Sequence, residues 1–326
     1  MRVHLAESLN DMPQIFREHL RSFEDLTTSY AAVRAGFVAL ALEKNRYATP
    51  FVEEARVLKA AASRAKAPNE LLLMGEIRSG LVTAAGVSDK ALGHLEEQNI
   101  SEAIAALIKN FLEPAEKNFV EELVFRFLLT RGDTLGGSMR NFGGALAERK
   151  FTRSLISCLR LAGRRYWWQR ARNAAWDASQ NIDADIEIYV KGLSWVSDKG
   201  PRTLLYNLSV PMVGKNVDFC LFSKAHSEIA KRDYKEPANY LALGELKGGI
   251  DPAGADEHWK TAATALERIR QAFAGYNPAI FFVGAAVAKA MAKEIWRLLE
   301  KGTVDNAANL TDDNQLAAVG RWLCSL

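Results

Sequence analysis

Long apolar runs are missing from this sequence of 326 residues. The longest, such as residues 279–288, fall well short of the roughly 20 residues that a membrane-spanning helix needs. The first residues lead into a polar stretch and not into the apolar segment of a secretion signal. Because 48% of the residues are apolar and 25% are charged, we expect a soluble globular protein with no membrane partner.

Cysteine is scarce, and neither sign of charge dominates. The three cysteines, Cys158, Cys220 and Cys324, are odd in number and widely spaced, which argues against a disulfide framework and against a structural zinc site. This usage favours a reducing cytoplasm. The net charge of +3 is too small for a strongly basic, non-specific nucleic-acid binder, so any DNA site must be local.

Nucleotide-binding loops are absent too. The sequence has neither G-x-x-x-x-G-K-[ST] nor a G-x-G-x-x-G that follows a strand, and we therefore expect no nucleotide cofactor. The glycines of residues 132–137 predict a loop that leads into a helix, whose N-terminus faces DNA phosphate or braces a subdomain interface. Asp133 and Arg140 in this region have no assigned role.

The pattern of apolar residues predicts a mixed α and β (α/β) fold in two closely packed parts. Residues 20–162 have helical spacing, with a helix start at Thr49-Pro50 and helix ends at Gly132 and Gly163. After residue 185 the texture changes to strands. We place an approximate boundary between a mainly helical part, 1–176, and an α/β part, 177–326. The expected strands are 186–190, 203–206, 217–222, 240–243 and 279–283, and the later helices are 256–273, 288–300 and one near the C-terminus.

Three polar residues stand at the chemically informative positions of the expected strands. Asp218 lies in one strand, and Glu245 and Lys247 end a later one. Residues two apart in a strand point to the same face, so Glu245 and Lys247 project together. Two carboxylates that hold a hard cation, beside a positive group that stabilises developing charge or positions water, are what phosphodiester hydrolysis requires. The set predicts a Mg²⁺ site.

The acid-x-Lys pattern alone is weak, because residues 148–150 and 233–235 match it as well. Context separates the three matches. Residues 148–150 fall in an expected amphipathic helix and residues 233–235 in a polar connection, whereas Glu245 ends an apolar strand with Asp218 in a neighbouring one.

The residues around this set are unusual enough to indicate a family. The stretch that begins Gly-Glu-Leu-Lys-Gly-Gly-Ile-Asp-Pro resembles the AvaI and BsoBI restriction endonucleases, and further likeness covers nearly the whole chain. The segments that carry the resemblance are residues 244–262, 34–37, 41–45, 132–141, 215–218 and 308–311.

The resemblance implies a type II restriction endonuclease with a core of the PD-(D/E)xK type and a largely helical subdomain. It implies a homodimer that encircles double-stranded DNA and cuts both strands at CYCGRG, with Mg²⁺ and without ATP. Asp218, Glu245 and Lys247 match the catalytic set, and Asp218 and Glu245 the metal ligands. His258 matches a histidine near the attacking water, while Asp251 and Lys90 match residues that contact base edges.

Other interpretations of these residues stay open. A lone histidine such as His258 is usually structural, and Asp251 before Pro252 is typical of a turn or cap, which is compatible with base contact. Residues 149–172 contain eight basic residues and no acidic one, a composition suited to DNA phosphate or to a plain solvated face. The candidates for DNA backbone contact are Arg149, Arg153, Arg160 and Arg164.

Three alternative functions differ from this expectation in testable ways. A repair or recombination nuclease on the same core would cut without the sequence preference that Asp251 and Lys90 imply. A DNA-binding protein that has lost catalysis, or a structural protein in which Glu245 and Lys247 merely pair, would be indifferent to mutation of Asp218 in activity assays. The intact set of Asp, Glu, Lys and His argues against both of these non-enzymes.

Overall fold

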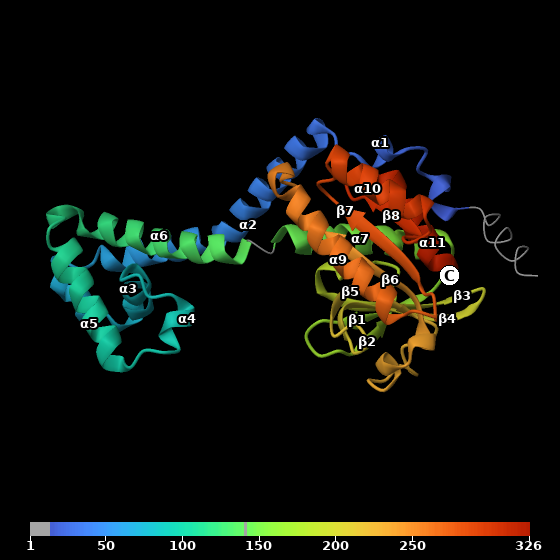
Figure 1. Cartoon of the computed structure of the whole chain (residues 1–326). Coiled ribbons are helices and arrows are strands. Elements are labelled where there is room, and N and C mark those ends of the chain that lie inside the picture. Colours follow the sequence, from blue (N-terminus) through green and yellow to red (C-terminus); the bar gives the residue numbers. More distant parts are fainter. Residues whose placement is uncertain (1–13, 140–141) are drawn as a thin grey trace, which may run out of the picture. The chain divides into compact units, whose positions relative to one another are not determined.

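The computed structural model describes residues 14–139 and 142–326, and the chain divides into two compact units (Figure 1). The sheet unit consists of the described residues up to Phe37 together with Gly143–Leu326, and the helical unit is Val38–Phe142. One long helix, α2 (Tyr30–Ala62), contributes residues to both units. Arg140 lies outside the described residues. No described helix has the length and apolar character needed to cross a membrane.

An eight-stranded sheet forms the centre of the sheet unit in the described part of the chain, in the order β2-β1-β3-β4-β5-β6-β7-β8. Neighbours are antiparallel up to β6, whereas β6, β7 and β8 are parallel. Parallel neighbours need a crossover, and helices α9 and α10 supply it. The strands are β1 (Tyr166–Arg170), β2 (Trp176–Ala178), β3 (Val190–Ser197), β4 (Gly200–Val210), β5 (Lys215–Phe222), β6 (Tyr240–Lys247), β7 (Ala279–Gly284) and β8 (Asn306–Asn309).

Helices pack against both faces of this sheet. Phe281 and Phe282 are neighbours in β7, so their side chains leave opposite faces. On one face the Phe282 ring meets Trp259, with ring centroids 5.3 Å apart. On the other face Phe281 lies between Phe151 and Trp322, at centroid distances of 6.2 Å and 5.9 Å. The helices of this unit are α1 (Phe23–Leu26), α7 (Phe142–Leu161), α8 (Ile186–Tyr189), α9 (Ala255–Ala272), α10 (Lys289–Glu300) and α11 (Asp313–Ser325).

The helical unit has an apolar core of its own. Leu71, Leu112 and Leu123 are fully buried there, beside Ile104 and Phe127. Its helices after α2 are α3 (Arg78–Ala84), α4 (Asp89–Leu92), α5 (Glu97–Leu107) and α6 (Phe119–Met139), with short turns between them.

The expected mixed α and β fold is confirmed, with four of the five expected strands and the three later helices in place. The strand expected at residues 186–190 is wrong except for Val190, which begins β3. Asp185 takes a left-handed backbone (φ 61°), and the short helix α8 follows it. The helix end at Gly163 is confirmed by its φ of +66°.

Two expected helix boundaries are wrong. Thr49-Pro50 lies inside α2, and Gly132 lies inside α6, so the loop expected at residues 132–137 is helical. In both places buried side chains further along the same helix, such as Ala55 and Leu135, continue its packing and override the local signal.

The two-unit division also differs from the boundary expected near residue 176. Helix α7 and strand β1 precede that residue, yet they belong to the sheet unit because β1 pairs with β3 and α7 packs its Phe151 against the sheet.

Candidate active site

Strands β5 and β6 separate where the informative residues stand. The two strands pair as far as Phe219 and Gly244, and beyond this pair no register continues. There the Leu246 N–H donates to Asp218 Oδ2 at 2.7 Å, so a carboxylate takes the place of a backbone partner. We call this separation the fork. It exposes the ends of both strands to solvent while β6 stays paired with β7 as far as Lys247.

An irregularity in β4 accompanies the fork. The pairing of β4 with β5 includes Tyr206 with Phe219 and Leu208 with Val217, but not the intervening residues. Asn207 stands at this break with φ +50°, a left-handed conformation that is uncommon in a strand. Its amide donates to Glu148 Oε2 at 2.8 Å. The register is the same on both sides of this break, and the break lies opposite Asp218.

Glu245, Lys247 and Asp218 meet at the fork. Lys247 Nζ lies 3.2 Å from Glu245 Oε2 and 4.0 Å from Asp218 Oδ2. Glu245 is 4% exposed, whereas Asp218 and Lys247 are half-buried. The predicted convergence of the three side chains is therefore present, with the deepest position occupied by the carboxyl group of Glu245.

The electrostatics of the fork make Glu245 unusual. Burial, followed by the nearby negative charge of Asp218, raises the pKa of Glu245 from 4.5 to about 7, although Lys247 opposes the change. Two neighbouring carboxyl groups in a dehydrated position are stabilised by any cation between them. The pair therefore has the character of a cation site.

A cleft with a volume of about 830 Å³ opens at the fork. Besides the three central residues it is lined by the beginning of β5 and by one face of α9. Sequence reasoning missed these lining residues, although the spacing of Lys260, Thr264 and Arg268 by four residues was available as a signal. The further lining residues are Ser209, Gly214, Lys215, Asn216, Lys260, Thr261, Thr264, Ala265 and Arg268.

Two carboxylates are what this cleft offers to a metal. Within the described residues no group of three or more His, Cys, Asp and Glu side chains is placed to hold an ion. Asp218 and Glu245 fit Mg²⁺ nevertheless, because this ion keeps several waters and is bound through one or two carboxylates plus a substrate phosphate.

His258 and Asp251 lie outside the residues that line the cleft. His258, on the first turn of α9, is exposed, and its ring packs against the glycine loop after Lys247. A Cβ added to Gly249 would come within 3.0 Å of His258 Nε2. Asp251 is exposed and caps a short turn, its Oδ1 accepting from the Ala253 N–H at 2.9 Å. The expected cap role of Asp251 is thus present.

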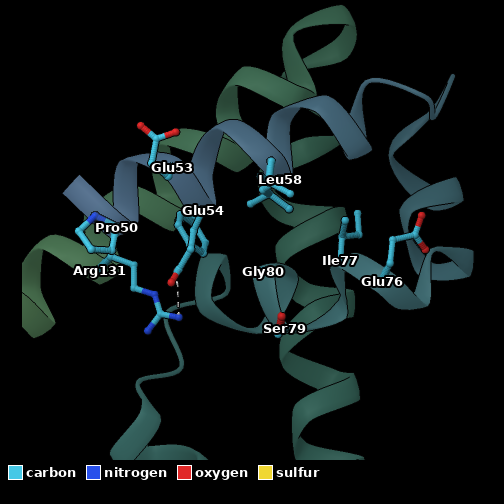
Figure 2. Close-up of a pocket in the computed structure, with 11 residues that line it drawn as sticks. Pro50, Glu53, Glu54, Leu58, Glu76, Ile77, Ser79, Gly80 and Arg131 are labelled. Carbon is cyan, nitrogen blue, oxygen red and sulfur yellow. Dashed lines mark ion pairs between the residues drawn. The ribbon is translucent and has the colours of Figure 1, made fainter. Parts of the chain in front are cut away.

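Lys90 belongs to the helical unit and is exposed on α4. The preceding residue, Asp89, forms an ion pair with Arg131 at 3.2 Å, and Arg131 also pairs with Glu54 at 3.4 Å. Figure 2 shows the Arg131 and Glu54 side chains pointing toward each other at a hollow of about 640 Å³ in this unit. Arg131 thereby ties the turn that carries Lys90 to α2 and α6.

The basic residues of α7 are largely occupied within the fold. Arg153 binds Asp183 at 3.0 Å and also contacts Glu187, while Arg160 reaches Asp183 at 2.9 Å. Arg164 pairs with Asp198 at 3.0 Å. Arg149 is half-buried. The ion pairs of Arg153 and Arg160 connect α7 to the segment before β3, and that of Arg164, which follows α7, reaches the turn after β3. The contact of these residues with DNA phosphate stays a prediction.

The rival acid-x-Lys matches do not form comparable sites. Asp233 is buried and binds Lys224 at 2.8 Å, and Lys150 pairs with Asp313 at 2.9 Å. Neither match brings a second carboxylate to its lysine as the fork does, among the contacts of the described residues. The match that ends an apolar strand is therefore the one whose lysine lies beside two carboxylates.

Known proteins match this chain over almost its full length. A family described as "Restriction endonuclease BsobI" matches residues 16–326. Type II restriction enzymes AvaI from a Nostoc species and from Anabaena variabilis are each 56% identical over 313 residues, which is 95% of this chain and 99% of theirs. Type II restriction enzyme BsoBI from Geobacillus stearothermophilus is 49% identical over 318 residues, 95% of this chain and 98% of its own.

Proposed function

The chain belongs to the AvaI and BsoBI family of type II restriction enzymes, which are site-specific deoxyribonucleases, and we propose that it hydrolyses both strands of duplex DNA at CYCGRG. The reaction is proposed to need Mg²⁺ and not ATP. The observation that carries this proposal is the fork, where Asp218, Glu245 and Lys247 converge at an open cleft.

Each residue of the fork has a distinct part in the proposed reaction. Asp218 and Glu245 hold the metal, which when bound lowers the pKa of water and neutralises charge on the scissile phosphate. Lys247, within 4.0 Å of both carboxylates, stabilises charge that develops on the phosphate or orients the attacking water. The Leu246 N–H fixes the orientation of the Asp218 carboxylate.

The remaining family positions are proposed to serve water activation and base recognition. The His258 imidazole is exposed and is of the kind that accepts protons in catalysis, and its ring lies against the glycine loop that follows β6. Asp251 is exposed and accepts hydrogen bonds, which suits the amino group of cytosine. Lys90 is exposed, and its ammonium group donates hydrogen bonds, which suits the acceptor atoms of guanine in the major groove.

A palindromic target also implies a two-fold protein. We propose a homodimer in which each subunit cuts one strand, because two-fold symmetry matches the symmetry of a palindrome. The buried, unpaired thiols of Cys158, Cys220 and Cys324 support a reducing compartment such as the cytoplasm.

Digestion of a fully sequenced plasmid with Mg²⁺ and without ATP tests the proposal. Discrete fragments whose sequenced ends lie at CYCGRG support it, and chelation of divalent ions should abolish them. Fragments that end at unrelated sequences would instead indicate a repair or recombination nuclease, and tight binding of the site without cutting would indicate a DNA-binding protein.

A further inference from the structure

One face of α9 continues the cleft away from the fork. Lys260, Thr264 and Arg268 are four residues apart, so they lie in one row along the helix. The opposite face, which includes Trp259 and Leu266, is buried in the core and fixes the rotation of the helix. The row is therefore held toward the cleft by the packing of α9.

The cleft has more positive than negative side chains. Lys215, Lys247, Lys260 and Arg268 line it together with the two carboxylates of the fork. Lys260 is held by Asp256 at 2.6 Å. Lys215 and Arg268, in contrast, form no ion pair with any residue in the described ranges, although both stand where an anion can reach them. Their charge is available to a ligand.

The dimensions of the row suit a nucleic-acid strand. From Lys260 to Arg268 the helix rises about 12 Å, at 1.5 Å per residue. One strand of duplex DNA carries a phosphate about every 3.4 Å along its axis, so the row is long enough to follow about three phosphates. A DNA strand that is cut at the fork extends beyond the scissile phosphate, and this face of α9 lines the same cleft as the fork.

We propose that Arg268 and Lys215 bind phosphates that flank the scissile one, and thus position the cut strand in the fork. This inference rests on the proposed function. In this proposal Arg268 and Lys215 contact the phosphate backbone of the DNA and not its bases. They therefore contribute to DNA affinity without sequence preference.

The test compares Arg268→Ala and Lys215→Ala with a control on the same helix, Arg270→Ala. Arg270 is exposed but bound to Glu267 at 2.7 Å, and it does not line the cleft at the fork. Affinity is measured for a CYCGRG duplex and for an unrelated duplex, with a chelator to prevent cutting, over a series of salt concentrations. Thermal unfolding of each variant checks that it is folded.

We expect each alanine variant to weaken binding of both duplexes by the same factor, about 3-fold to 30-fold. The slope of log affinity against log salt should fall by about 0.9 for each lost phosphate contact. Arg268→Lys should restore the slope, and Arg270→Ala should leave it unchanged. The loss of affinity should exceed the loss of cleavage rate at saturating DNA.

If the enzyme cuts its site but neither alanine variant changes the slope of log affinity against log salt, this inference is overturned. The proposed function would still stand. A loss confined to the CYCGRG duplex would overturn it too, because it would indicate base contact. If the wild-type chain neither cuts nor binds duplex DNA, the proposed function fails together with the inference.

Discussion

Glu245 is a carboxyl group in a position that disfavours its charge. The raised pKa means that the folded chain binds a proton more tightly than the unfolded chain does. The resulting stability is fully present below about pH 4.5 and is lost as the pH rises through about 7. Without a metal, the free energy of unfolding should therefore decrease over this range.

The variant Glu245→Gln tests this linkage in urea unfolding with a chelator present. Its free energy of unfolding should exceed that of the wild type by about 3 kcal/mol at pH 8, because the pKa of Glu245 rises from 4.5 to about 7 on folding and each pKa unit is worth about 1.4 kcal/mol. The difference should vanish below about pH 4, where Glu245 is protonated in the folded and the unfolded chain. Glu257→Gln, an exposed change on α9, should show no such difference. If Glu245→Gln were less stable than the wild type at pH 8, the ionised Glu245 carboxylate would not destabilise the fold.

Gly244 is required by its neighbour in β7. A Cβ at this position would lie 2.2 Å from the ring of Phe281, which is fully buried and cannot move aside. Gly244→Ala should lower the free energy of unfolding by about 1–3 kcal/mol. Gly144→Ala, in a helix with no atom near the added methyl group, should instead raise it by about 0.5–1 kcal/mol. If the two changes altered the free energy of unfolding equally, Gly244 would not be in close contact with Phe281 of β7.

At the scale of elements, Asn207 sets the shape of β4 beside the fork. Its left-handed backbone is accessible to glycine but costs a β-branched residue about 1–3 kcal/mol. Asn207→Gly should therefore retain cleavage, whereas Asn207→Val should reduce both stability and cleavage by removing the break opposite Asp218. Urea unfolding and cleavage rates check both variants. Full activity of Asn207→Val would mean that the break has no part in placing Asp218.

Central strands were predictable from sequence because they are apolar on both faces. β5 and β7 contain runs of Val, Ile, Leu and Phe, and β6 begins with Tyr-Leu-Ala-Leu. Helices cover both faces of the sheet at these strands. β1 and β2 were missed because their side chains are mostly half-buried or exposed, because they follow a basic helix, and because β2 is a three-residue strand at the sheet edge. β8, with the sequence Asn-Ala-Ala-Asn, has no residue that favours a strand and is set by its pairing with β7.

The central residues of the candidate site could be predicted from the same apolar strands, but the residues around them could not. Asp218, Glu245 and Lys247 interrupt apolar strands with charge, a contrast that is visible in one dimension. Lys215 and Arg268 give no such contrast, because basic residues at a strand start and on an exposed helix face are common. Only the packing of α9 shows that they line the same cleft.

At the scale of the whole molecule, the two units have separate apolar cores. Leu123 is fully buried in the helical unit and Leu243 in the sheet unit. Each Leu→Ala change should cost about 2–5 kcal/mol in its own core. In hydrogen exchange, Leu123→Ala should speed exchange mainly within residues 38–142, and Leu243→Ala mainly in the strands. Exchange that rises equally in both units for either variant would show that the chain unfolds as one body.

The most direct test of the fork as the catalytic centre compares two lysines that share the acid-x-Lys pattern. Lys247 belongs to the fork, whereas Lys235 is exposed on a short turn and does not line the cleft. Single-turnover cleavage of a plasmid with Mg²⁺ should slow by about 100-fold or more in Lys247→Ala, the scale of a lost transition-state contact, and remain at the wild-type rate in Lys235→Ala. Asp218→Asn should behave like Lys247→Ala. Cleavage at the wild-type rate by Lys247→Ala or Asp218→Asn would contradict the account.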